Sequence, residues 1–142
     1  MRALLDINVL LALLDRDHLD HQRARSWLES EIAGGWASCP ITENGFVGVI
    51  SQRRYPNPIS PAEAITLLAG ATAQPHCQFW ACDRSLLDAS VVDRSRLHGP
   101  RQVTDAYLLA LATVHRGRFV TFDRSISIAV APGATADNLV VM

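Results

Sequence analysis

Four acidic side chains stand where a predicted strand ends or a predicted helix begins. Asp6 and Asp123 each follow a short apolar run, and Glu43 and Asp105 fall in the first turns of predicted helices. Carboxylates that a fold gathers within a few ångströms repel one another and take up protons unless a cation lies between them. Oxygen ligands, with water completing the shell, are what Mg²⁺ or Mn²⁺ prefers. The four acids therefore predict a divalent-metal site.

Such a site activates water and stabilises the extra negative charge of a phosphodiester under attack. Each acid also has a structural interpretation. Asp6 can cap the helix that follows it, Glu43 and Asp105 can favour the positive end of a helix, and Asp123 can cap a turn with Ser125. Either interpretation is open for any one acid, and the joint pattern of the four favours the metal site.

The elements that must position these acids alternate along the chain. Strands are expected at residues 3–5, 36–39, 78–81, 118–122 and 139–141. Helices are expected at about residues 9–14, from a cap at Asp20 to Gly34, from Pro40 to Ile50, from Pro61 to about Gly70, from Arg84 to Val92, and from Val103 to before Gly117. This order predicts a three-layer α/β/α sandwich with a parallel sheet of four or five strands, formed by one domain over residues 1–142. In a parallel sheet, the four acids converge on one edge.

Composition limits the function classes. The net charge of -1 does not indicate a strongly basic nucleic-acid-binding domain, so any such binding must use a local patch. All 13 basic residues are arginine. The lack of lysine argues against an aspartyl-phosphate mechanism at Asp6, as in phosphatases similar to haloacid dehalogenases or in receiver domains, because those need a lysine near the phosphate.

The cysteines and the apolar runs bear on the compartment. Cys39, Cys77 and Cys82 are odd in number and lack zinc-site spacing, so we expect reduced thiols. No apolar stretch reaches the roughly 18 residues that a membrane span requires. Asp6 and Asn8 interrupt the first apolar run, which argues against a signal peptide. We therefore expect a cytosolic protein that does not enter membranes.

Four blocks of the sequence resemble those of the PIN-domain nucleases, in particular the VapC-type toxins of bacterial toxin-antitoxin pairs. The blocks are residues 5–13 (LDINVLLAL), 42–45 (TENG), 104–112 (TDAYLLALA) and 120–123 (VTFD). The resemblance implies a PIN-like fold and a metal-dependent endoribonuclease whose four acids hold one or two Mg²⁺ or Mn²⁺ ions. It also implies a homodimer, and an antitoxin whose C-terminal segment fills the active groove.

The family's site residues carry over onto matching positions of this chain. Asp6 and Asp105 correspond to primary metal ligands, and Glu43 and Asp123 to further ligands or water-orienting groups. The supporting polar positions of the family match Asn8, Thr104 and Thr121. The segment 18–27 is also similar to the family's second helix.

Other polar residues allow several interpretations. Arginines in or near predicted loops could contact RNA phosphates, meet the antitoxin or remain solvated; they are Arg53, Arg54, Arg94, Arg96 and Arg101. His18 and His21 could be considered as a metal pair, but no third ligand accompanies them. We expect Trp36 and Trp80 in the core. A catalytically silent RNA-binding or partner-binding module of the same fold is the alternative function, and metal-independent RNA binding without cleavage would favour it.

Overall fold

A five-stranded parallel sheet, in the order β3-β2-β1-β4-β5, runs through the middle of the computed structural model, which describes all 142 residues. The strands are β1 (Ala3–Leu5), β2 (Trp36–Ser38), β3 (Cys77–Phe79), β4 (Arg118–Thr121) and β5 (Leu139–Val141). The helices are α1 (Ile7–Leu14), α2 (His21–Glu31), α3 (Pro40–Ile50), α4 (Pro61–Thr72) and α5 (Val103–Val114). Five short 3₁₀ helices lie at Ile32–Gly34, Arg94–Arg96, Pro100–Gln102, Ile128–Val130 and Ala136–Asn138.

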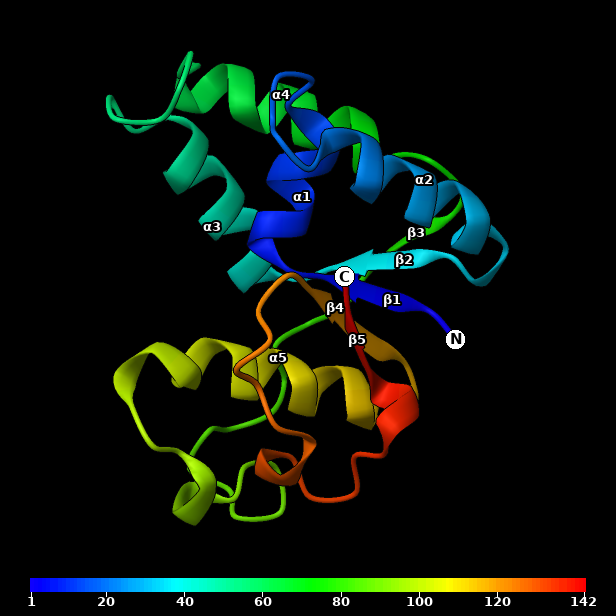
Figure 1. Cartoon of the computed structure of the whole chain (residues 1–142), viewed down its shortest axis with the longest axis vertical. Helices are drawn as coiled ribbons and strands as arrows, with labels where there is room; N and C mark the ends of the chain where they lie inside the picture. The colour runs from blue at the N-terminus through cyan, green and yellow to red at the C-terminus, as the bar shows by residue number, and fades with distance from the viewer.

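Helices cover both faces of the sheet. Figure 1 shows α1 to α4 above it and α5 below it. The alternation of side chains along β1 explains this arrangement, since Ala3 and Leu5 pack in one apolar cluster with α1, α3 and α4, while Leu4 packs in a second cluster with α5. A strand buried on both faces is a continuous apolar run, as in this sequence. The predicted three-layer sandwich is confirmed, and its parallel sheet has five of the four or five strands expected.

The order of the strands reverses at β1. The chain passes from β1 to β2 and β3 on one side, and later places β4 and β5 on the other side. The connections next to the reversal diverge to opposite faces, which leaves a crevice at the carboxyl ends of β1 and β4. Asp6 follows β1 and Asp123 follows β4 by two residues, so both lie at this crevice.

Local hydrogen bonds set the ends of the helices. Helix α1 begins earlier than expected because the Asp6 carboxylate accepts a hydrogen bond from the N–H of Ile7. The predicted capping box of α4, between Ser60 and Glu63, is confirmed. Asp20 occupies the cap position of α2 without making the expected capping bond, and its carboxylate instead lies 3.0 Å from the guanidinium of Arg23.

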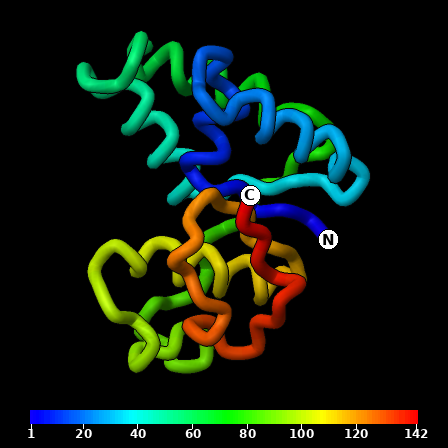
Figure 2. Tube along the Cα trace, viewed as in Figure 1, coloured from blue at the N-terminus to red at the C-terminus, as the bar shows by residue number.

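The helix predicted from Arg84 to Val92 is wrong. This part of the chain consists of turns and irregular backbone within the long connection from β3 to α5, which Figure 2 shows below the sheet. Ser85 accepts a bond from the N–H of Leu87, and the Asp88 carboxylate accepts bonds from the N–H and hydroxyl of Ser90. Such local side-chain bonds offer the backbone an alternative to a helix.

Buried and exposed side chains follow the expected distribution at several positions. Trp36 and Trp80 are buried, which confirms both as core residues, and the three cysteines are free.

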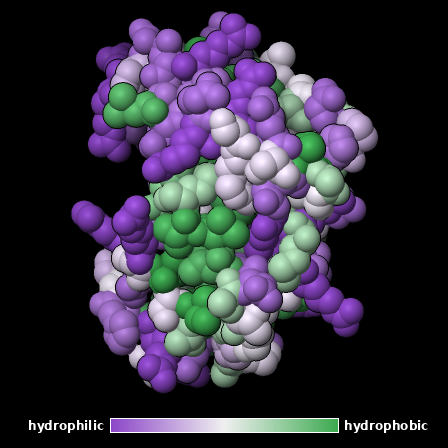
Figure 3. Space-filling model, turned by 45° about the vertical axis from the view of Figure 1, so that its right-hand side comes forward, coloured by the Kyte–Doolittle hydropathy of each residue, from purple (hydrophilic) through white to green (hydrophobic).

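Figure 3 shows an apolar area in the middle of one face, beneath a largely hydrophilic upper part. None of the helices combines the length and apolar character needed to cross a membrane.

Candidate metal centre at the carboxyl edge of the sheet

Asp6 is held rigidly at the end of β1. Its side chain is 5% exposed, and its N–H donates to the carbonyl of Val120 in the neighbouring strand. One carboxylate oxygen accepts from the N–H of Ile7 at 2.7 Å, and the other accepts from the Thr121 hydroxyl at 2.7 Å. The helix-capping role and a role in the site are therefore compatible, because each oxygen has a lone pair left for a ligand.

Thr121 links the two acids that end strands. Its hydroxyl, fully buried, donates to Asp6 and accepts the N–H of Asp123 at 3.0 Å. Asp123 itself is exposed, and its carboxylate accepts the N–H of Ser125 at 2.8 Å. The predicted turn with Ser125 is thus present, and it fixes the Asp123 carboxylate beside the crevice.

Asp105 completes a group of three carboxylates. It lies in the first turn of α5, is half-buried, and makes no hydrogen bond or ion pair within the protein. Burial raises the pKa of Asp105 to about 6, and the charges of Asp6 and Asp123 add to the rise. The structure therefore brings Asp6, Asp105 and Asp123 near enough to repel one another.

The other two aspartates respond to opposite influences. Burial raises the pKa of Asp6, and the charge of Asp123 adds to this, although the bonds from Thr121 and Ile7 oppose the rise. Hydrogen bonds from Ser125 lower the pKa of Asp123. Asp123 therefore supplies a steady negative charge beside two carboxyl groups that hold their protons more tightly than usual.

Glu43 belongs to the same edge but faces another neighbour. Its carboxylate accepts a hydrogen bond of 2.6 Å from the hydroxyl of Ser38, the last residue of β2. Burial raises the pKa of the Cys77 thiol to about 11, and the charge of Glu43 contributes to that rise. No three His, Cys, Asp or Glu side chains lie close enough together to enclose one ion.

The donor set nevertheless fits a hard divalent cation. None of the four acids forms an ion pair with an arginine or histidine. No positive side chain of the protein therefore offsets the repulsion among Asp6, Asp105 and Asp123. Carboxylate oxygens are the ligands that Mg²⁺ and Mn²⁺ prefer.

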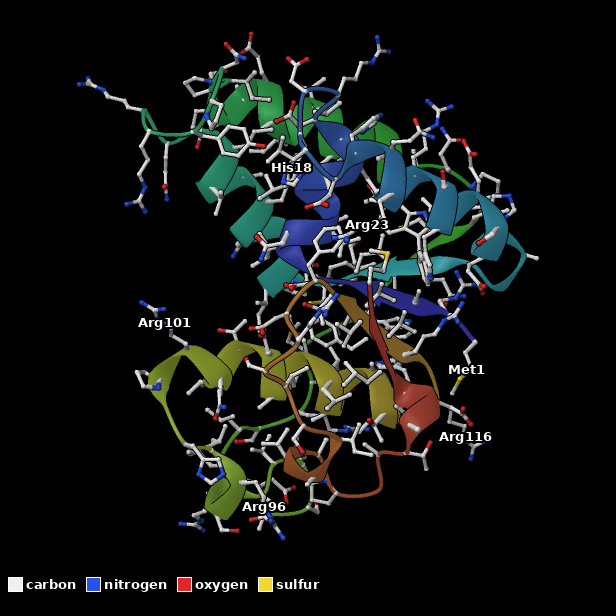
Figure 4. All side chains as sticks on the ribbon, viewed as in Figure 1. Met1, His18, Arg23, Arg96, Arg101 and Arg116 are labelled. Carbon is white, nitrogen blue, oxygen red and sulfur yellow. The ribbon has the colours of Figure 1, made fainter.

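The remaining predicted site residues differ in their surroundings. Asn8 and Thr104 are exposed and make no side-chain hydrogen bond, so of the three supporting positions only Thr121 contacts an acid. Arg53 and Arg54 are exposed in the loop after α3, and Figure 4 shows Arg101 projecting outward from the start of α5.

The two histidines near α2 are bound to backbone. The ring of His18 accepts the N–H of Asp20 at 3.0 Å, and the ring of His21 lies 2.7 Å from the carbonyl oxygen of Ala12. These contacts fix the entry into α2 and give a structural role to both rings. Sequence reasoning missed Ser38, although a serine at the end of a strand that leads into the helix of Glu43 was a usable signal.

Comparison with known proteins identifies the family. The family model described as "PIN domain" matches residues 3–130. The chain belongs to the PIN domain family. This PIN domain is 66% identical to "Ribonuclease VapC44" of Mycobacterium tuberculosis over 142 residues, the full length of both. It is 40% identical to "Ribonuclease VapC39" of the same organism over 134 residues, which are 94% of this chain and 96% of the relative. The resemblance seen in the four sequence blocks is confirmed.

Solved structures share the fold of this PIN domain. VapC20 of M. tuberculosis, described as a toxin that cleaves the sarcin-ricin loop, matches with a TM-score of 0.62 and 13% identity, covering 93% of this chain and 98% of that one. VapBC2 of Rickettsia felis, crystallised with a promoter DNA fragment, matches with a TM-score of 0.58 and 12% identity, covering 87% and 89%.

We expect Asp105→Asn to stabilise the metal-free protein near neutral pH and to change little near pH 4. The pKa of Asp105 is about 6 when folded against an ordinary value of 3.8, so the folded state binds its proton more tightly. The free energy of unfolding of the wild type therefore falls as the pH rises between these values. Asparagine removes the charge, and after allowance for solvent screening the gain near neutral pH is about 1–2 kcal/mol.

Urea unfolding in a chelator, at about pH 7.5 and about pH 4, measures this difference. An Asp105→Asn variant that is no more stable than the wild type at the higher pH would contradict the raised pKa that burial and the two neighbouring aspartates give Asp105.

Proposed function

We propose that this chain is a Mg²⁺- or Mn²⁺-dependent endoribonuclease that acts in the cytoplasm as the toxin of a toxin-antitoxin pair. The observation that carries the proposal is the group of three mutually repelling aspartates at the strand-order reversal of a PIN domain. Ligands of open parallel sheets bind at this place. The names of the relatives, ribonucleases at 66% and 40% identity, support RNA as the substrate.

The four acids divide into two pairs in this proposal. Asp6 and Asp105 would hold the ion, and Glu43 and Asp123 would act as further ligands or orient the attacking water. A bound Mg²⁺ would lower the pKa of a coordinated water and would stabilise the extra negative charge of the phosphodiester under attack. Thr121 orients the Asp6 carboxylate, and the Ser38 hydroxyl holds the Glu43 carboxylate at the end of β2.

The exposed arginines supply the local positive charge that the whole molecule lacks. We assign Arg53, Arg54 and Arg101 to the RNA backbone, because all three are exposed and none forms an ion pair. Contacts of arginine with phosphate depend strongly on salt and carry no sequence information.

We further propose an antitoxin partner and a homodimer. The structural neighbour from R. felis is VapBC2, which supports an antitoxin partner. The family resemblance implies that the C-terminal segment of this antitoxin would cover the groove at the acids. A segment that covers the acids keeps RNA away from them, so the free toxin is the active form.

Asp105→Asn is expected to lower RNA cleavage in Mg²⁺ or Mn²⁺ by at least about 100-fold, because loss of even an outer-shell partner of a metal ligand costs about 10- to 100-fold. The measurement is sequencing of RNA 5′ ends after incubation of total bacterial RNA with each protein. The matched control is Asp137→Asn, which removes an exposed carboxylate in the 3₁₀ helix that precedes β5, at the edge of the parallel sheet opposite to the acids.

New 5′ ends in the wild type and in Asp137→Asn, but not in Asp105→Asn, are the expected result. Equal maps from all three folded proteins would contradict the nuclease and would support the silent RNA-binding or partner-binding module.

Thr121→Val is expected to weaken cleavage about 10- to 100-fold, because Asp6 loses the hydroxyl that orients it. Thr121→Ser keeps this hydroxyl and should retain most of the activity. The decisive readout is the Mn²⁺ concentration for half-maximal cleavage, which should rise in Thr121→Val and remain near the wild-type value in Thr121→Ser. A fall in activity of equal size in both variants, at unchanged Mn²⁺ dependence, would indicate a role in packing alone.

A further inference from the structure

A hollow of about 130 Å³ borders the acid cluster on the α5 side of the sheet. Its walls come from the segment before α5, from the first turn of α5, and from the segment that follows β4. The lining side chains important to its chemistry are Arg96, His98, Gln102, Asp105, Ile126 and Val130. The volume is several times the roughly 10–15 Å³ that one water requires, so the hollow can accept part of a larger ligand.

The floor of this hollow is apolar. Val130 is 4% exposed and Ala106 is 1% exposed, and Ile126 is half-buried against the same apolar cluster. A flat ring can lie on such a floor and remove it from water. A phosphate would gain nothing from these side chains.

The rim carries hydrogen-bond donors that no protein atom uses. The guanidinium of Arg96 forms no hydrogen bond or ion pair, and the ring of His98 makes no hydrogen bond. The Gln102 side-chain oxygen accepts the N–H of His98 at 2.8 Å, which leaves its amide N–H groups free. An apolar floor with free donors above it is suited to a planar ligand with acceptors on its edge.

Asp105 fixes the position of the hollow relative to the proposed chemistry. Its carboxylate belongs both to the three repelling aspartates and to the wall of the hollow. A group bound in the hollow would therefore lie next to the phosphodiester under attack. The same negative charge disfavours a phosphate or an acidic side chain of a protein partner there.

We propose that this hollow, here called the base pocket, binds one unpaired nucleobase of the RNA beside the cleaved bond, with guanine preferred. The assignment rests on the proposed ribonuclease function. Sequence-specific RNA recognition uses bases that are splayed out of single strands and stacked on flat side chains, and His98 offers such a ring. Guanine presents two adjacent acceptors, O6 and N7, which match the fork of an arginine such as Arg96.

Arg96 and Arg101 thereby have separate roles. Figure 4 shows Arg101 projecting outward at the start of α5, whereas Arg96 lies farther down the same half of the molecule. Arg101 is placed to meet backbone phosphate, and Arg96 is placed to determine which base precedes or follows the cut.

Cleavage of a random-sequence RNA pool in Mn²⁺ tests the base pocket. We expect the wild type to enrich guanine at one position next to the cut, and Arg96→Ala to reduce that enrichment about fivefold or more. Arg96→Lys keeps the charge without the fork and should lose the preference as well. Arg94→Ala is the matched control, since it removes one exposed arginine of the same 3₁₀ helix without altering the pocket lining.

A second measurement separates the pocket from the nuclease. Fluorescence anisotropy in a chelator compares the binding of labelled hexanucleotides with one guanine or none to the wild type, Arg96→Ala and Arg94→Ala. We expect a guanine preference of about fivefold in the wild type and Arg94→Ala, and none in Arg96→Ala. If the protein prefers the guanine-containing hexanucleotide in this assay but does not cleave the RNA pool, the proposed ribonuclease function is refuted and the base pocket is supported.

Equal affinity of the wild type for both hexanucleotides, or a cleavage preference that Arg96→Ala leaves unchanged, would overturn the base pocket. An Arg96→Ala variant that loses affinity equally for every RNA would overturn it too, since that is the behaviour of a phosphate contact.

Discussion

Repulsion among three carboxylates at one edge of the sheet is the constraint on which the rest of the site depends. Asp6, Asp105 and Asp123 come from different segments. Burial raises the pKa of Asp105 to about 6, and the charges of Asp6 and Asp123 add to the rise. Left free, such groups would separate into solvent. Asp6 cannot do so, because the backbone of Val120, the hydroxyl of Thr121 and the N–H of Ile7 hold it in place. The carboxylates therefore stay close together, and a bound cation would relieve their repulsion.

The two apolar clusters provide the rigidity that this arrangement requires. Every residue of α5 from Ala106 to Ala112 is buried, so the helix cannot slide away and carry Asp105 out of the crevice. β1 is buried between both clusters and fixes Asp6 from the other side. The three carboxylates, which repel one another without a ligand, therefore stand on buried elements that hold them in place. Functional sites commonly need such rigid support. The segment after β4, which completes the base pocket, lies against the same core.

Much of the fold and the acid positions could be predicted because their signals are local. The apolar run before Asp6 and the helical spacing from Val103 placed both acids correctly. The helix at residues 84–92 could not be excluded, since its apolar residues mask the turns formed by Ser85 and Asp88. The bond from Thr121 to Asp6 joins residues 115 apart, and the base pocket joins three separate segments, so no spacing indicates either. Glu43 was predicted at the correct edge, but its bond to Ser38 depends on where β2 ends.

Direct measurement of Mn²⁺ binding to the wild type and to Asp6→Asn tests the central claim. Asparagine caps a helix as well as aspartate does, so the variant should fold while losing the charge. Calorimetric titration at about pH 6 in buffers of different ionisation enthalpy should show binding to the wild type with release of a fraction of a proton, because Asp105 is only part-protonated there. Binding to Asp6→Asn should be weaker by about 100-fold or more. Equal binding by both proteins, or none by either, would contradict a metal centre built on these acids.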